Sequence, residues 1–209
     1  MSTYHKIHTV YKRDHENNMK TLLMGEYSLP EFAYLEQCHW VWTEKVDGTN
    51  IRIMLDEDGI MTFGGKTDRA QIPADLVNAL NEQFIPIHRG LAEKFPHGVI
   101  LYGEGYGPKI QKGGGNYRAF PGFVMFDVRV GHWWLQQEDV RNIGREFGIG
   151  VVPIVGEGNL LDMVSFVGRG MTSYWGAFDA EGVVARPAVE LHSRNRGRII
   201  TKLKVKDFS

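Results

Sequence analysis

Apolar residues recur mostly with the two-residue period of β-strands, which predicts a fold rich in sheet. The apolar positions alternate with polar ones or form short runs, and turns with glycine or acidic residues separate these segments. The sequence "DEDG" at 56–59 predicts a hairpin turn. The predicted strands are 39–45, 50–55, 60–63, 98–104, 123–130, 132–136, 151–155, 181–186 and 198–206.

Three segments instead show the 3.6-residue period of an amphipathic helix. Residues 74–84 are the first, and Pro86 ends or kinks that helix. Residues 137–147 form the second, with Gly148 as its C-cap, and residues 159–167 form the third, with Gly168 at its end. Strands in groups, with a few helices and no strict alternation, predict an α+β fold.

Size and composition restrict the class of protein. The 209 residues are enough for one good core, and we expect a single domain over 1–209. No apolar run approaches the ~20 residues that span a bilayer, and the polar start has no secretory signal. Cys38 is the single cysteine, which favours a reducing, cytoplasmic location. Because the net charge is -1, any affinity for nucleic acid must come from local clusters of positive charge.

The sequence "WTEKVDGTNIRI" at 42–53 contains a lysine whose role its neighbours leave open. Lys45 follows Glu44 and precedes Asp47, so on its own it reads as a charged residue at the end of a strand. A lysine amine attacks an electrophile only when neutral, and lowering its pKa from about 10.4 to about 7 requires roughly 4–5 kcal/mol. Flanking carboxylates act in the opposite direction. A nucleophilic Lys45 therefore requires other cations close by.

The C-terminal segment offers such cations. In "RIITKLKVKDF", Lys202, Lys204 and Lys206 recur with period two, so a strand would project all three from one face. Neighbouring lysines on that face would lie ~7 Å apart, a spacing suited to a phosphate chain. Arg194, Arg196 and Arg198 precede them. The alternative is an edge strand whose lysines prevent aggregation.

Six short motifs occur in an order that resembles a known enzyme family. They are "EKVDGTN", "GGKTDRAQ", "LYGEGYG", "VMFDVRV", "EGVVAR" and "TKLKVKDF". In this order and spacing they resemble the nucleotidyltransferase domain of the ATP-dependent RNA ligases, in particular the ligase 2-like group of phage enzymes. The resemblance covers nearly the whole chain. It implies antiparallel sheets flanked by helices, with the nucleotide pocket between them.

The resemblance also implies a reaction and a site. Lys45 would attack the α-phosphate of ATP and carry AMP, which would pass to the 5′-phosphate of an RNA strand before a 3′-hydroxyl seals the break. Lys202 and Lys204 would neutralise the phosphates, and Asp47, Glu104 and Glu181 would bind Mg²⁺ or Mn²⁺. The implied nucleotide contacts are Glu44, Lys45, Asn50, Arg69, Glu104, Phe126, Glu181, Val184, Lys202 and Lys204. The expected RNA contacts are Arg52, Arg194, Arg196 and Lys206.

Position 50 separates this group from other members of the superfamily. DNA ligases and capping guanylyltransferases usually place an arginine five residues after the lysine, whereas this chain has Asn50. Arg52 shares a strand face with Asn50 and could reach the same ligand. The alternatives that remain are a DNA nick ligase, a capping-type guanylyltransferase, and a non-catalytic module that binds RNA ends.

Two departures from the family pattern affect the expected partners. The chain ends three residues after Lys206, where related ligases continue into a C-terminal OB-type or helical module. We therefore expect a monomer acting on nicked or base-paired RNA, with a protein partner possible in place of that module. Arg69 lies further from Lys45 than the family pattern has it, and the glycine-rich loop at 109–118 carries three basic residues that could order over phosphate.

Overall fold

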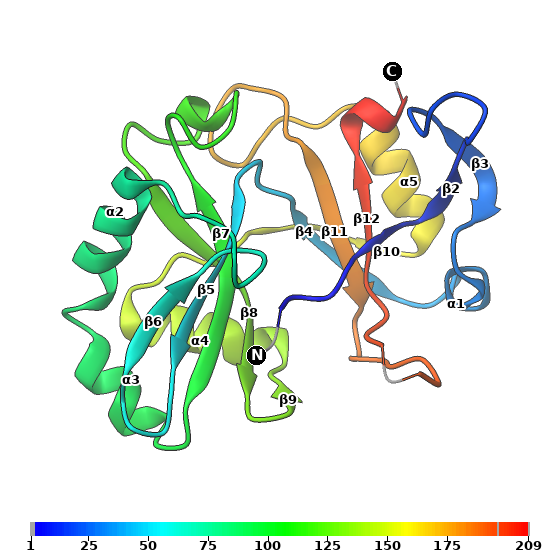
Figure 1. Ribbon diagram of the computed structural model, residues 1–209. Coiled ribbons are helices and arrows are strands. Elements are labelled where there is room, and N and C mark those ends of the chain that lie inside the picture. The colour runs from blue at the N-terminus through cyan, green and yellow to red at the C-terminus, as the bar shows by residue number, and fades with distance from the viewer. Residues whose placement is uncertain (1–2, 196, 209) are drawn as a thin grey trace. The chain divides into compact units, whose positions relative to one another are not determined.

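The computed structural model describes residues 3–195 and 197–208, which form two compact units (Figure 1). The first unit contains residues 47–152 together with the extreme N-terminus, and the second contains residues 5–46 and 153–209. Each unit has its own sheet and its own apolar core, and each is described by itself. No helix in the described part of the chain is long and apolar enough to cross a membrane.

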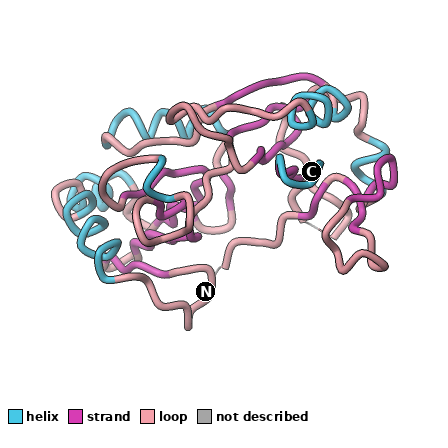
Figure 2. Tube along the Cα trace, turned by 90° about the horizontal axis from the view of Figure 1, so that it is seen from above, coloured by secondary structure: helices cyan, strands magenta, loops and turns pink. Residues whose placement is uncertain are grey.

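The first unit is built on a five-stranded antiparallel sheet. Its strands in spatial order are β6 (Met61–Gly64), β5 (Thr49–Leu55), β7 (Val99–Tyr106), β8 (Gly122–Val130) and β9 (Trp133–Trp134). The helices are α2 (Ala74–Phe84), α3 (His88–Lys94) and α4 (Gln137–Phe147), with a short 3-10 turn, η1, at Gly114–Asn116. Apolar side chains of all three helices pack against one face of the sheet, and Figure 2 shows the helices outside the strands.

The other face of this sheet carries a different set of side chains. Asn50 and Glu104 are paired residues of β5 and β7, and Phe126 follows in β8. Because the strands alternate, this face is separate from the packed core. The sheet therefore presents three predicted nucleotide contacts away from its helices.

The second unit is built on a mixed sheet and a separate hairpin. The sheet order is β1 (His8–Thr9), β12 (Thr201–Lys204), β11 (Gly182–Pro187), β4 (Trp40–Glu44) and β10 (Ile154–Gly158). All its pairings are antiparallel except that of β1 with β12. The hairpin joins β2 (Tyr11–Arg13) to β3 (Leu22–Tyr27), and the helices are α1 (Pro30–Tyr34), α5 (Leu160–Gly168) and the 3-10 turn η2 (Val205–Phe208). The core includes buried residues of β4, β11, β12 and α5.

The fold confirms the predicted α+β class and most of the predicted elements. Helices α2 and α4 have the predicted bounds, and Gly148 caps α4 in the left-handed region with φ 66°. Helix α5 begins after Asn159, which forms a capping box with Asp162. Residues 151–155 were predicted as a strand, but β10 begins at Ile154. The elements β1, β2, β3, α1 and α3 were not predicted.

The predicted strand 198–206 is wrong at both ends. Strand β12 covers only Thr201–Lys204, and η2 follows at once. Asp207 accepts the backbone N–H of Lys204 at 3.0 Å, which turns the chain out of the strand. Lys206 therefore does not continue the row that Lys202 and Lys204 begin.

Candidate nucleotidyltransferase site

The turn after β4 positions Lys45 in the second unit. The backbone N–H of Lys45 donates to the carbonyl of Gly182 at 2.9 Å, so the β4–β11 pairing continues through the lysine. Strand alternation places Trp42 and Glu44 on one face of the sheet and Thr43 and Lys45 on the other. Lys45 thus leaves the core and lies on the open face of β4 and β11.

Glu181 links this lysine to the C-terminal strand. Its Oε2 lies 2.5 Å from the Lys45 Nζ, and its Oε1 lies 2.5 Å from the Lys204 Nζ. The three side chains are 13–23% exposed, which shields them partly from water. One carboxylate therefore holds two lysines, from segments about 160 residues apart in sequence, within reach of a single ligand.

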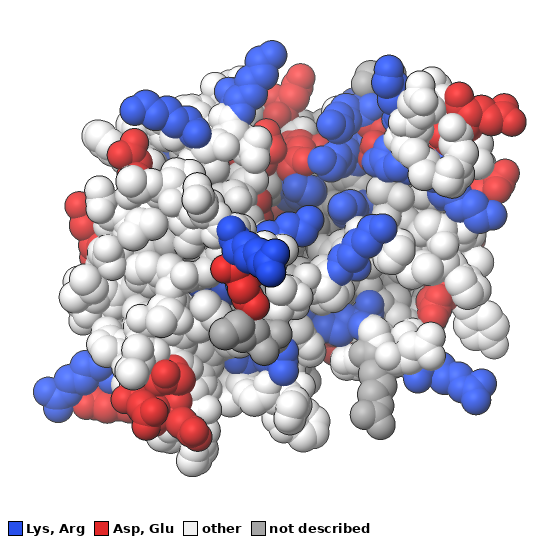
Figure 3. Space-filling model, viewed as in Figure 1, with Lys and Arg blue, Asp and Glu red and all other residues white. Residues whose placement is uncertain are grey.

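Lys202 completes a group of three lysines. It is paired with Val184 across β11 and β12, and Val184 is paired with Thr43 of β4, so these residues share the open face. Burial lowers the pKa of Lys202, the charges of Lys45 and Lys204 lower it further, and Glu181 opposes them. We define Lys45, Glu181, Lys202 and Lys204 as the lysine cluster. Figure 3 shows basic side chains gathered over β12 and its neighbours on this side of the second unit.

Arg13 and Asp207 adjoin the lysine cluster and were missed by the sequence analysis. The Nη2 of Arg13 lies 2.8 Å from Oδ1 of Asp207, and the charge of Arg13 also lowers the pKa of Lys202. Asp207 is almost fully buried, and its other oxygen holds the end of β12. An acidic residue so close to the basic row, in "KVKDF", could have indicated an ion pair. The contact of Arg13 with Asp207 joins residues at opposite ends of the sequence, so local sequence could not predict it.

Glu44 lies on the opposite face and has a different environment. It is 1% exposed, and its carboxylate accepts from the Ser173 hydroxyl at 2.6 Å and the Tyr174 N–H at 2.7 Å. Burial raises the pKa of Glu44, and these two hydrogen bonds partly offset that effect. The predicted nucleotide contact of Glu44 stays a prediction, but its side chain already holds the loop before β11.

In the first unit, the predicted residues line the turn into β5 and its pairing with β7. The Asp47 N–H donates to the Tyr117 hydroxyl at 3.1 Å. Gly48 must be glycine here, because an added Cβ would lie 2.3 Å from the carbonyl oxygen of Gly105. The Oδ1 of Asn50 is buried and accepts no hydrogen bond within the described residues, which leaves an acceptor for a ligand.

Phe126, Arg52 and Arg69 differ in how exposed their side chains are. Phe126 is half-buried and meets the ring of Tyr4 edge-on, with centroids 5.0 Å apart. Arg52 is 1% exposed, and its guanidinium donates to the carbonyl of Gly65 at 2.8 Å and to Asp68 at 2.9 Å. The RNA contact predicted for Arg52 would have to displace these bonds. Arg69 is exposed.

The remaining predicted RNA contacts differ in their exposure. Arg194 is exposed, and Arg196 lies outside the described residues. Arg198, in the same basic segment, is buried and forms an ion pair with Glu190 at 2.5 Å. No group of three Asp, Glu, His or Cys side chains within 3–195 and 197–208 could hold a metal. The roles of Asp47, Glu104 and Glu181 as metal ligands thus stay predictions.

Comparisons with known proteins agree with this fold. An unliganded variant of the Naegleria gruberi RNA ligase superposes with a TM-score of 0.67 at 16% identity, covering 86% of this chain and 52% of the ligase. A variant of that ligase with ATP and Mn gives 0.67 at 16% identity, covering 85% and 54%. A third, with AMP and Mn, gives 0.66 at 15% identity, covering 84% and 52%.

These matches bear on the fold, and the sequence match bears on the family. The chain spans about half the length of the ligase structures that it matches. No curated protein matches the chain. Residues 38–204, from just before β4 to the end of β12, match the family model described as RNA ligase. The chain belongs to the RNA ligase family.

Proposed function

We propose that this chain is an ATP-dependent RNA ligase whose nucleophile is Lys45. The observation that carries the proposal is the lysine cluster, in which Glu181 contacts both Lys45 and Lys204 on the face that Lys202 shares. Family membership and the likeness to a ligase with bound ATP and Mn support it. Cations grouped on an open strand face suit a polyphosphate substrate.

In the first step, the Lys45 amine attacks ATP and loses a proton. The lone pair of its neutral Nζ forms an N–P bond to the α-phosphorus of ATP. The bond from that phosphorus to the oxygen bridging to the β-phosphate breaks, and its electron pair leaves with pyrophosphate. The proton released from the amine goes to Glu181 or to water, because the Glu181 carboxylate already contacts the Nζ.

The other two lysines stabilise the charge that moves in this step. Negative charge develops on the pyrophosphate oxygens, and fixed ammonium groups are worth most where water is partly excluded. Glu181 holds Lys204 in place through an ion pair. Lys202 lies two residues earlier in β12, on the same face of the strand. This arrangement provides positioning and charge neutralisation, which are the main requirements of phosphoryl transfer.

A divalent cation fits the chemistry of the predicted carboxylates. Oxygen ligands suit Mg²⁺ and Mn²⁺, and Glu181 in the second unit and Asp47 and Glu104 in the first are of this type. When bound, such a cation supplies positive charge near the phosphates and orients them. Glu181 would hold such a cation through the carboxylate oxygens that contact Lys45 and Lys204.

The later steps move AMP and then join the strands. A 5′-phosphate oxygen of RNA attacks the adenylyl phosphorus, the N–P bond to Lys45 breaks, and the amine regains a proton. A 3′-hydroxyl then attacks the 5′-phosphate, loses its proton and displaces AMP. We assign RNA contacts to Arg194 and Lys206, and the contact predicted for Arg196 falls outside the described residues. These charges predict that RNA affinity falls as salt rises.

The test of the first step is transfer of label from ATP to protein. The chain is incubated with ATP labelled at the α-phosphate and Mg²⁺ or Mn²⁺, then run on a denaturing gel. We expect a labelled band that Lys45→Ala abolishes and that the matched control Lys94→Ala, whose lysine pairs with Glu146 in the first unit, retains. Labelling by GTP instead would indicate a capping-type enzyme. No labelling by either would overturn the proposal in favour of a non-catalytic module.

The test of strand joining begins from pre-adenylylated ends. Nicked duplexes that carry a 5′-adenylylated RNA or DNA strand are offered to the native chain without ATP. We expect sealing of the RNA nick at the higher rate. Preference for the DNA nick would make the chain a DNA ligase, and no sealing of either would restrict its activity to adenylyl transfer.

A further inference from the structure

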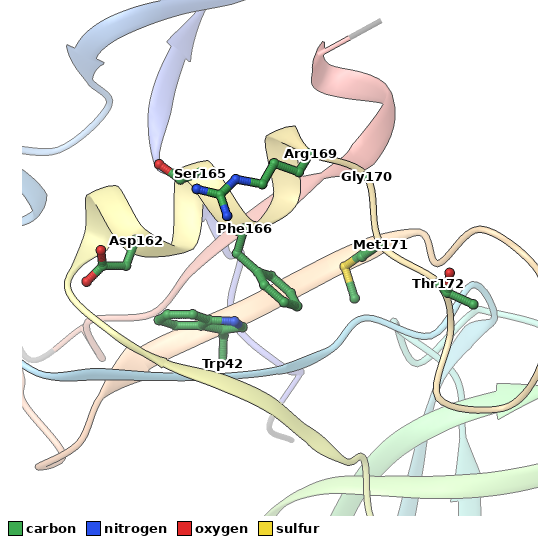
Figure 4. Close-up of a pocket in the computed structure, with 8 residues that line it drawn as sticks. All are labelled: Trp42, Asp162, Ser165, Phe166, Arg169, Gly170, Met171 and Thr172. Carbon is green, nitrogen blue, oxygen red and sulfur yellow. The ribbon is translucent and has the colours of Figure 1, made fainter.

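The reverse side of the second sheet contains a pocket that the proposed reaction does not use. It lies where α5 ends above β4 and has a volume of about 660 Å³ (Figure 4). This volume is in the range of small-molecule sites, roughly 300–1,000 Å³. Because strand alternation points Trp42 away from Lys45, the pocket and the lysine cluster lie on opposite faces of β4. Its lining residues are Trp42, Asp162, Ser165, Phe166, Arg169, Gly170, Met171 and Thr172.

An aromatic pair forms the apolar part of this pocket. The rings of Trp42 and Phe166 have centroids 6.0 Å apart with planes inclined at 48°, and Figure 4 shows Phe166 above the indole. Trp42 is 2% exposed and forms the floor, whereas Phe166 is half-buried and presents a ring surface. A flat ligand could contact that surface, since aromatic rings pack well in offset or edge-on arrangements.

The indole nitrogen of Trp42 is the observation that points to a ligand. Its N–H is buried and has no hydrogen-bond partner among the described residues. A buried donor without an acceptor costs about 1–3 kcal/mol, so such groups are usually satisfied. Gly156, the strand partner of Trp42 in β10, packs against the indole and offers no side-chain acceptor. In Figure 4 the nitrogen is on the side of the indole nearest Phe166, where a ligand acceptor would satisfy it.

The polar side chains around the rings select a negatively charged ligand. Arg169 is exposed, makes no ion pair within the described part of the chain, and in Figure 4 extends its guanidinium back along α5 toward Ser165. The hydroxyls of Ser165 and Thr172 add further donors. The one carboxylate, that of Asp162, already accepts the N–H of Asn159 at 2.9 Å. Arginine beside an aromatic surface suits a phosphate joined to a base.

We propose that this pocket binds a nucleoside monophosphate unit, with its base against Phe166 and Trp42 and its phosphate at Arg169. The base supplies the acceptor for the Trp42 N–H. The unit comes either from a single-stranded RNA segment or from a free mononucleotide. The site does not involve Lys45, so it goes beyond the proposed ligase reaction and does not depend on it.

The experiment observes the Trp42 N–H directly in the 209-residue chain. The five tryptophans give five indole N–H resonances, and Trp42→Phe identifies the one from position 42. The probes are uridine 5′-monophosphate and a short oligouridylate, which avoid an adenine-specific site. We expect the Trp42 resonance to shift with at least one probe. A shift with the oligonucleotide alone assigns the site to RNA, and a shift with both assigns it to the mononucleotide. No shift with either overturns the proposal.

Two variants test whether the charge of Arg169 contributes to binding in this pocket. Arg169→Ala should weaken binding of the probe that shifts Trp42 by about tenfold, as expected for one hydrogen bond to a charged group. The control Arg145→Ala removes another exposed arginine, from α4, and should bind as the native chain does. Equal losses in the two variants would show non-specific charge attraction and would overturn the site. Adenylyl labelling from ATP is measured in parallel, so that failure of this site and failure of the ligase proposal are told apart.

Discussion

Glu44 and Glu181 lie close to the same pair of strands in the second unit, yet their carboxylates have opposite kinds of partner. Glu181 contacts two lysines at 2.5 Å on the open face of the sheet. Glu44 is 1% exposed on the packed face and accepts from neutral donors, the Ser173 hydroxyl and the Tyr174 N–H. The open face of the sheet therefore carries a carboxylate paired with lysines, and the packed face carries a buried carboxylate with neutral partners.

One sheet can thus carry reactive groups on one face and structural groups on the other. The partners of Glu181 are long lysine side chains that can exchange its carboxylate for a phosphate at little cost, because the ion pairs are partly exposed. The partners of Glu44 belong to a loop that loses its anchor if the carboxylate is removed. Substitutions on the open face should thus change activity, and those on the packed face should change stability.

Removal of either cluster lysine tests the open face and has the largest expected effect. Lys202→Ala and Lys204→Ala should each slow adenylyl labelling by about 100-fold or more, because each removes a fixed charge that stabilises the transition state. Neither should lower the free energy of unfolding by much. Rates of labelling and thermal melts measure both effects, with Lys94→Ala as the control. Rapid labelling in both variants would mean that the cluster does not act on ATP.

Removal of Glu44 tests the packed face. Glu44→Ala leaves the buried Ser173 hydroxyl and the Tyr174 N–H without their acceptor, and should lower the free energy of unfolding by about 3 kcal/mol. Urea denaturation of this variant and of Glu181→Ala measures the contrast. If Glu181→Ala were the less stable of the two, the assignment of structure to one face and chemistry to the other would be wrong.

Much of the fold was predictable because its elements have strong local periodicity. Helices α2 and α4 repeat apolar residues at helical spacing over 11 residues each, and the structure has both at the predicted bounds. Strands β1 and β2 have two and three residues, and β1 pairs with β12 across more than 190 positions. So short a strand carries little pattern, and its partner cannot be read from local sequence.

The direction of a site side chain could be predicted where the alternation of a strand determines it. It could not be predicted where a residue distant in sequence holds the side chain or turns the backbone. The row of Lys202 and Lys204 follows from strand alternation, whereas Lys206 leaves it because Asp207 turns the chain. Arg52 was expected to reach RNA, but Asp68 and the carbonyl of Gly65 hold it in the interior. Nothing in the residues next to Arg52 indicates that pairing.

Gly156 offers a smaller test of the packed face. An added Cβ would lie 2.4 Å from Nε1 of Trp42, and the indole is a rigid ring in the core that cannot give way. Gly156→Ala should therefore cost about 2 kcal/mol of stability, as overpacking typically does. The control Gly115→Ala meets no atom within 4 Å and should be neutral or stabilising. Equal melting temperatures for the two variants would contradict the close packing of β10 on Trp42.

The pH dependence of stability is the smallest expected effect, and it tests the open face through Lys202. Burial and the neighbouring cations lower its pKa in the folded chain below the ordinary 10.5. Between these two pKa values the unfolded chain binds more protons than the folded chain, so stability rises with pH. For one group the slope cannot exceed about 1.4 kcal/mol per pH unit. Lys202→Met should flatten this rise in urea denaturation at successive alkaline pH values, whereas Lys94→Met should keep it. An unchanged slope in Lys202→Met would mean that neither burial nor the neighbouring cations lower the pKa of Lys202 in the folded chain.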